Sequence, residues 1–207
     1  MDWGCFQPQK PQAPPRLEPY IQPVNGIVQP PVIPPPNRPG RRTNVLDSLK
    51  SALGVIWKSR LSYYFRYPVD AVRLGIPDYH KVIKYPMDLS TIRKRLQNNY
   101  YWQADEAMED FELIIDNCLE YNEEGTEVHS AGLELREAFH QRLDFIDMSN
   151  EVEIIPQTGS RKRKAETFSQ PMINSPDDEC STYTRQQKPN LDYIEYKEEA
   201  ISNRIRF

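Results

Sequence analysis

An apolar segment and one carboxamide at the end of a helix are the residues of this chain best suited to binding chemistry. Residues 63–87 contain three prolines and show neither helical nor strand periodicity, whereas residues 104–121 have helical spacing. A buried carboxamide among apolar side chains requires a ligand that supplies its hydrogen-bond partner. The sequence therefore predicts a site for a small, neutral, hydrogen-bonding group, with an apolar wall at Val69, Leu74, Ile76 and Tyr79 and a polar end at Cys118, Tyr121 and Asn122.

Four amphipathic helices are predicted to position that site. Each has apolar residues at helical spacing, and Thr43 (or Asn44), Asp88 and Thr126 are suitable N-caps. A loop as long as residues 63–87 inside a compact domain is usually functional. Because no strand pattern or internal repeat is found, we expect an all-α four-helix bundle with one core. Its predicted helices span about residues 43–62, 88–97, 104–121 and 126–146.

Both ends of the chain are predicted to be disordered tails, which places the folded domain at residues 43–149. Residues 1–42 hold 12 of the 19 prolines and favour an extended polyproline conformation. Within them, residues 36–41 fit a PxxPxR docking pattern, although a plain extended linker is the favoured interpretation. Residues 150–207 are largely polar, and their end, residues 191–205, is expected to form a marginal helix or to fold on a partner.

Charge and composition argue against several classes of function. Residues 43–150 carry 12 basic and 18 acidic side chains, a net −6, which disfavours duplex DNA as the main ligand and suits basic partners. The three cysteines are far apart, with no Cys/His ladder, so neither a disulfide framework nor a zinc site is expected. No apolar run of 18 residues and no signal sequence is present, so we expect a soluble, intracellular protein without a cofactor, metal or membrane contact.

Three motifs follow one another in the chain: PVDAVRLGIPDYHKVIKYPMDL, NNYYW and NCLEYN. Through these motifs, and over about residues 41–148, the chain resembles a bromodomain, the acetyl-lysine-binding module, and within that family the first bromodomain of the BET (bromodomain and extra-terminal) group. Taken alone, Asn122 would ordinarily be a helix C-cap and Tyr79 a core aromatic; the joint arrangement favours ligand binding. The resemblance implies a left-handed four-helix bundle that binds acetylated histone tails as a monomer.

The family's site residues carry over at matching positions. Asn122 would donate to the acetyl carbonyl, because its NH2 group has two hydrogens. Tyr79 would reach the same oxygen through a water molecule. The remaining assignments are Val69, Leu74 and Ile76 as the loop wall, Cys118 as the base, Tyr121 as the partner of Asn122, Val128 as the gatekeeper, and Phe65 beside the shelf.

The shelf and the rim depart from the family or add to it. The family's Trp-Pro-Phe shelf is here Tyr63-Tyr64-Phe65, which predicts a looser and more polar shelf. The family has two acidic residues directly before the gatekeeper. Here those positions hold Thr126 and Glu127, so only one acid remains. An acidic rim, or otherwise a plain solvated face, is predicted at Asp70, Glu120, Glu123, Glu124 and Glu127, and it would attract basic tails.

The sequence thus predicts a nuclear, non-enzymatic reader of acetylated histones in transcriptional control, with further chromatin proteins bound through its tails. Arg161, Lys162, Arg163 and Lys164 indicate a nuclear localisation signal, or otherwise a basic linker or nucleic-acid contact. No second bromodomain or extra-terminal motif follows residue 150, which indicates a short single-bromodomain member.

Two other functions fit parts of the sequence less well. One is a scaffold whose divergent shelf has weakened the pocket. The other is an enzyme, which is disfavoured because His80, His129 and His140 lack partners at catalytic spacing.

Overall fold

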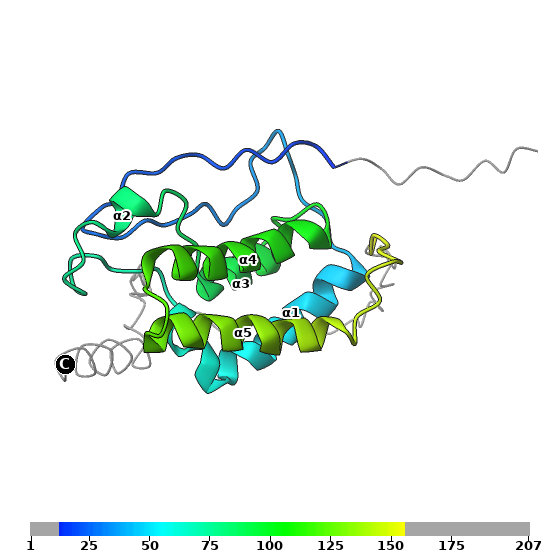
Figure 1. The fold of residues 1–207 in the computed structure, drawn as a ribbon. Helices are drawn as coiled ribbons and strands as arrows, with labels where there is room; N and C mark the ends of the chain where they lie inside the picture. The colour runs from blue at the N-terminus through cyan, green and yellow to red at the C-terminus, as the bar shows by residue number, and fades with distance from the viewer. Residues whose placement is uncertain (1–12, 156–207) are drawn as a thin grey trace, which may run out of the picture. The chain divides into compact units, whose positions relative to one another are not determined.

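The computed structural model describes residues 13–155, and in that range the chain is all-α, with no β-strand (Figure 1). None of the helices in this range is long and apolar enough to cross a membrane. The predicted helical bundle is confirmed. Its elements are α1 (Asn44–Lys58), the 3-10 helix η1 (Arg60–Phe65), α2 (Tyr79–Val82), α3 (Leu89–Gln97), α4 (Ala104–Tyr121) and α5 (Glu127–Leu143).

The helices begin at the caps that the sequence indicated. The Thr43 hydroxyl accepts a hydrogen bond from the Leu46 N–H at 3.0 Å, and the Asp88 carboxylate accepts one from the Thr91 N–H at 3.1 Å. These bonds satisfy amide groups that the first turn of a helix leaves unpaired. The predicted ends of the first and fourth helices were too late, since extended Ser59 ends α1 and starts η1, and α5 ends at Leu143.

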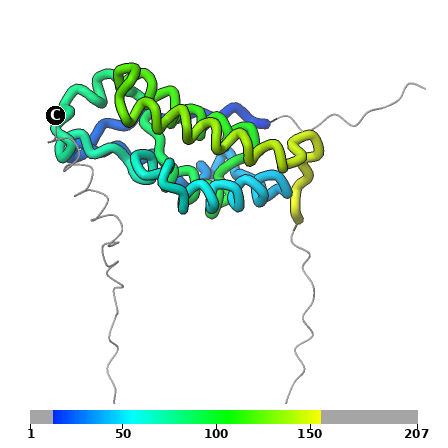
Figure 2. The backbone as a smooth tube through the Cα atoms, turned by 60° about the horizontal axis from the view of Figure 1, so that its bottom comes forward, coloured from blue at the N-terminus to red at the C-terminus, as the bar shows by residue number. Residues whose placement is uncertain are grey.

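The core lies where the four long helices meet. Helix α1 contacts α3, α4 and α5, while α4 also contacts α3 and α5, and Figure 2 shows the helices lying lengthwise beside one another. The rings of Phe111 on α4 and Phe139 on α5 stack at 3.7 Å between centroids. Leu49, Ile92 and Leu135 are buried around them. Burial of such side chains contributes roughly 1.5–3 kcal/mol each, so this core stabilises the scaffold that holds the loops.

The segment 63–87 is more ordered than a plain loop. It contains the end of η1, a series of turns and helix α2, and it forms a second apolar cluster around Ala71, Tyr79 and Ile83. Its far end is attached to α4, because the buried Asn117 side chain donates to the Tyr85 carbonyl at 3.0 Å. The sequence missed this internal structure because short turns produce no repeating pattern.

Residues 13–42, which we call the N-terminal strap, lie against the bundle. They run out along α4 to a turn at Asn25-Gly26 and return to α1, as the blue trace in Figure 1 shows. The expectation of a disordered tail does not describe these residues. An extended proline-rich segment has no core of its own, but here side chains of the bundle supply its partners.

A buried ion network joins the strap to the bundle. Arg95 of α3 is 0% exposed and donates to Asp110 of α4 at 2.6 Å and to Glu18 of the strap at 2.9 Å. Asp110, 1% exposed, also accepts from the Tyr101 hydroxyl at 2.7 Å and from Arg16 at 2.8 Å. Every charge in this group therefore has a partner, which a buried charge requires.

The chain after α5 also returns to the bundle. The Ile154 N–H donates to the Arg42 carbonyl at 2.8 Å, and the Val152 N–H to the Asn44 side chain at 2.7 Å. The folded part thus continues past the boundary expected at residue 149. Residues 156–207, with the predicted basic run and most of the predicted tail, lie outside the described residues.

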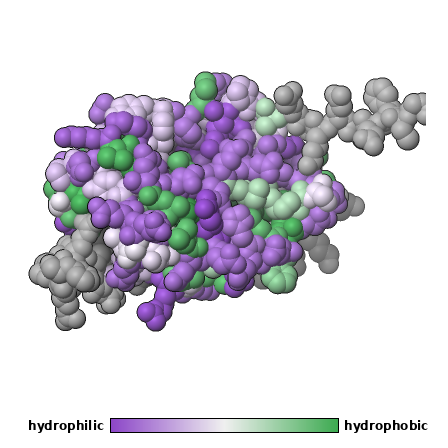
Figure 3. Space-filling view, viewed as in Figure 1, coloured by the Kyte–Doolittle hydropathy of each residue, from purple (hydrophilic) through white to green (hydrophobic). Residues whose placement is uncertain are grey.

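On the face seen in Figure 3 hydrophilic residues dominate, and apolar residues form small separate groups.

Candidate functional site

The predicted wall of the site is a packed apolar group. Val69, Ile76 and Tyr121 pack against the cluster that contains buried Tyr79. The rings of Tyr79 and Tyr121 meet edge to face, with centroids 4.9 Å apart, which joins helix α2 to the end of α4. Burial raises the pKa of Tyr79, so its hydroxyl stays neutral and can hydrogen-bond to a ligand or water. Leu74 lies half-buried on the same loop.

Asn122 stands at the end of α4, as predicted, and is half-buried. Its backbone N–H donates to the Cys118 carbonyl at 3.0 Å, and its side-chain nitrogen donates to the same oxygen at 2.8 Å. The side-chain nitrogen lies 3.8 Å from the Cys118 sulfur, which is a weak acceptor. The NH2 group is thus committed to the helix end through one strong hydrogen bond, and the sulfur is a further, weak partner.

Cys118 forms an apolar, uncharged surface beside Asn122. Burial raises the pKa of its thiol to about 11, against a smaller lowering by the Asn122 hydrogen bond, so the thiol is neutral at physiological pH. The thiol donates to the Val128 carbonyl at 3.3 Å and so connects α4 to the start of α5. Helix α5 approaches closely at Gly132, where an added Cβ would stand 2.9 Å from the Cys118 sulfur and 3.7 Å from Phe65.

The predicted shelf lies in η1 and at its end. The ring of Tyr64 makes edge contacts with Tyr63 at 5.1 Å and with buried Phe65 at 6.4 Å between centroids. Its hydroxyl donates to the Glu127 carboxylate at 2.7 Å. The tyrosine at the family's proline position thus gains a hydrogen bond to the first residue of α5, a restraint that the sequence did not indicate.

The acidic residues predicted at the rim differ in what they contact. Glu120, Glu123 and Glu124 are exposed. Asp70 is half-buried, and its carboxylate accepts from the Arg73 N–H at 3.0 Å, as in a capped turn. With Glu127 bonded to Tyr64, two of the five acids have local structural partners, and the other three present their charge to solvent.

Several side chains that position the site were missed from the sequence. Asp78 accepts from the Tyr121 hydroxyl at 3.0 Å, and Asn117 fixes the end of the loop to α4. Gly132 offered one usable signal, since glycine inside a helix is unfavourable unless close packing requires it.

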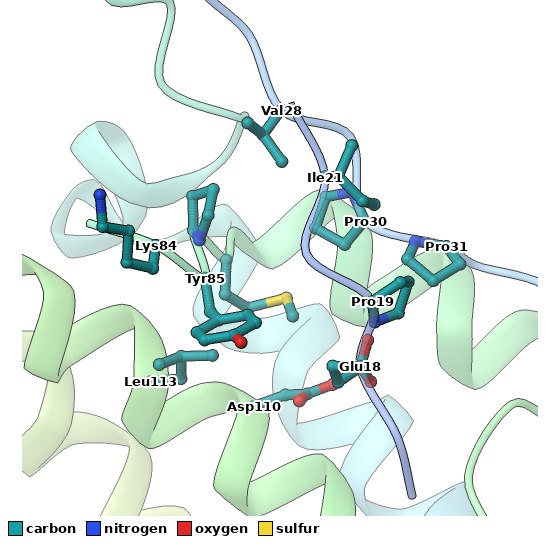
Figure 4. A pocket seen from close by; sticks show the side chains of 12 residues that line it. Glu18, Pro19, Ile21, Val28, Pro30, Pro31, Lys84, Tyr85, Asp110 and Leu113 are labelled. Atoms are coloured by element: carbon teal, nitrogen blue, oxygen red, sulfur yellow. The ribbon is translucent and has the colours of Figure 1, made fainter. Parts of the chain in front are cut away.

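A second, separate groove lies between the strap, the residues before α3 and helix α4 (Figure 4). Its lining is mainly apolar and includes Ile21, Val28, Tyr85 and Leu113. Asn122 and Tyr79 do not line it. Within residues 13–155 no three His, Cys, Asp or Glu side chains are grouped to hold a metal ion.

A comparison with protein families gives a match over most of the helical bundle. A family model described as "Bromodomain" matches residues 49–134, which run from within α1 to within α5 and include every predicted wall, base and shelf residue. Bromodomains are non-enzymatic modules that read acetyl-lysine in chromatin proteins. Over residues 49–134 the helical bundle of this chain thus matches the bromodomain family.

Proposed function

We propose that this bromodomain binds acetylated lysine in histone tails and acts in chromatin-based regulation of transcription. The carrying observation is Asn122, a half-buried carboxamide at the end of α4 with one N–H committed to Cys118. An acetyl carbonyl would accept the second hydrogen. The acetyl methyl and the lysine stem would lie among Val69, Leu74, Ile76 and the gatekeeper Val128.

Selectivity for the modified lysine follows from charge. An unmodified lysine would bring an ammonium group into a site walled by apolar side chains and a neutral thiol, where its loss of hydration is costly. Acetylation removes that charge and leaves one carbonyl to be satisfied. Tyr79, neutral because burial raises its pKa, would hold a water molecule against the same carbonyl.

The exposed acids around the site support a basic peptide as the ligand. Glu123 and Glu124 directly follow Asn122, and their negative potential would raise the encounter rate with a Lys- and Arg-rich tail.

We further propose that the chain belongs to the BET group, that residues 161–164 direct it to the nucleus, and that it binds as a monomer. The alternative, a scaffold with a weakened pocket, is favoured by one observation, the changed shelf at Tyr63 and Tyr64.

Substitution of the carboxamide tests the proposal. Asn122→Ala should weaken binding of a di-acetylated histone peptide by about 1–3 kcal/mol, because the acetyl oxygen loses its donor. Calorimetric titration of the full chain measures the effect. The matched control is Gln141→Ala, which removes another carboxamide that donates one turn back in its own helix, to Glu137 of α5, at an exposed position.

The outcomes separate the two functions. Binding by the wild type and by Gln141→Ala, with loss in folded Asn122→Ala, supports the acetyl-lysine reader. Equal affinities of wild type and folded Asn122→Ala would contradict the assignment of Asn122. Absence of binding to any acetylated peptide would favour the scaffold.

A further inference from the structure

The tip of the N-terminal strap rests on the loop that walls the site. The Gly26 carbonyl accepts two hydrogen bonds of 2.9 Å, one from the Ala71 N–H and one from the His80 ring nitrogen Nε2. Because a carbonyl only accepts, Nε2 of His80 carries the hydrogen. Ala71 and His80 lie at the two ends of the segment that contains Leu74, Ile76 and Tyr79. One carbonyl of the strap therefore joins both ends of the site wall.

The contact requires glycine at the tip. Gly26 has a φ of +81°, in the left-handed region that other residues rarely adopt, and an added Cβ would stand 2.7 Å from the Val72 nitrogen. Backbone hydrogen bonds of 2.9 and 3.1 Å between Val24 and Ile27 close the turn. The turn thus brings its backbone against the loop at a distance that a side chain would prevent.

Both arms of the strap are anchored away from the tip. On the outgoing arm, Glu18 pairs with the buried Arg95. On the returning arm, the Pro31 carbonyl accepts from the same arginine at 2.9 Å, and buried Arg38 is bonded to buried Glu106 of α4. Anchoring on both sides fixes the position of the tip, so the tip can hold a loop that lacks long helices of its own.

We propose that the N-terminal strap is a positioning element of the acetyl-lysine site, with Gly26 and His80 as its positioning residues. This inference rests on the proposed acetyl-lysine binding. A loop held in its binding conformation loses less conformational freedom when a ligand arrives, and apparent affinity scales with the populated fraction of the competent conformation. Release of the tip should therefore weaken peptide binding without touching any residue that contacts the peptide.

Substitutions at His80 in the full chain test the inference. His80→Phe keeps a ring beside Tyr79 and removes the donor, so peptide binding should weaken about two- to tenfold, as expected for one hydrogen bond. His80→Gln places an amide N–H near the position of Nε2 and should restore most of the affinity. Hydrogen exchange should quicken for residues 69–80 in His80→Phe and should stay slow in His80→Gln, a readout that a change in global stability would not confine to this loop.

A glycine pair gives an independent test. Gly26→Ala should weaken binding and quicken the same exchange, because its Cβ pushes the tip away from Val72. Gly54→Ala, in the middle of α1, serves as the control, since its added Cβ would meet no described atom within 4 Å apart from its chain neighbours and the backbone of its own helix.

The results distinguish this inference from the proposed function. If wild type binds, Asn122→Ala does not, and His80→Phe and Gly26→Ala bind like wild type, the strap does not position the site. Equal weakening by His80→Phe and His80→Gln would also overturn it, because the effect would then come from the ring itself. If wild type fails to bind, the proposed function falls and the affinity claim with it, while the exchange data still decide whether the strap orders the loop.

Discussion

The polar groups toward the two ends of helix α4 lie in contrasting environments. Near its start, Asp110 is 1% exposed and its carboxylate is shared among Arg95, Arg16 and Tyr101. At its end, Asn122 is half-buried and binds only the carbonyl of its own helix one turn back, with a weak sulfur contact besides. One end has strong partners for its buried charges, whereas the other keeps a donor available.

This difference separates an end that stabilises the fold from an end that is suited to the proposed binding. Buried charges with complete partners oppose local opening, since breaking any pair leaves another charge unpaired. A neutral carboxamide beside apolar walls has no such cost in the free protein, and a ligand carbonyl can improve its hydrogen bonding. A single continuous helix therefore joins a buried ionic anchor to the proposed binding site.

The largest expected effect comes from the anchor. Asp110→Ala leaves the Arg95 guanidinium buried without its closest partner and should lower the free energy of unfolding by about 3–5 kcal/mol. Urea denaturation measures the change. The control Glu109→Ala removes a neighbouring carboxylate that is 68% exposed and 3.8 Å from Arg16, and it should cost at most about 1 kcal/mol.

The same measurement on Asn122→Ala sharpens the comparison. It removes a side-chain hydrogen bond within one helix turn, so we expect a loss of only about 0.5–1.5 kcal/mol in unfolding free energy. A loss as large as that of Asp110→Ala would contradict the division between anchor and binding site.

An effect smaller than that of Asp110→Ala is expected where α5 approaches the base of the site. The added methyl of Gly132→Ala would overlap the Cys118 sulfur at 2.9 Å, and overpacking of this kind costs about 1–3 kcal/mol. Displacement of Cys118 should also weaken peptide binding. Gly54→Ala, with open space around its Cβ, should instead stabilise α1 by about 0.5–1 kcal/mol. Thermal unfolding and peptide titration of both variants test this pair. If Gly132→Ala has the stability and the peptide affinity of wild type, Cys118 can move aside without cost.

Local signals explain what the sequence could predict. The bounds of α4 followed from helical spacing and the start of α3 from Asp88, because caps and periodicity are encoded within a few residues. Asn122 and Tyr79 were found through a resemblance to a family, since neither residue alone departs from a cap or a core aromatic. The structure places the ring of Tyr79 against that of Tyr121 and the side chain of Asn122 against Cys118, whereas the roles of these residues toward a ligand remain predictions.

The strap could not be predicted because its partners are distant in the chain. Arg95 and Glu18 are 77 positions apart, and Arg38 and Glu106 are 68 apart. Proline-rich composition indicates only that a segment cannot form its own core. Whether such a segment lies on a bundle depends on buried charges of the bundle that need partners, and no pattern in residues 13–42 shows them.

The smallest expected effect is a difference between the two ends of α4 in their response to salt concentration. Exposed charges are screened at high ionic strength and buried pairs much less, so between about 0.05 M and about 0.5 M salt peptide association should slow several-fold while the unfolding free energy changes little. Glu123→Gln with Glu124→Gln should slow association at low salt and flatten its salt dependence. The control pair, Glu134→Gln with Glu137→Gln, changes net charge equally at exposed positions about 10 Å or more further along α5, and should retain the response.

Stopped-flow association rates, measured for both pairs across this salt range, show whether the acids beside Asn122 attract the peptide. If both pairs behave like wild type, the acids beside Asn122 do not face the bound peptide; if both flatten the response equally, the attraction comes from the net charge of the bundle and not from a rim.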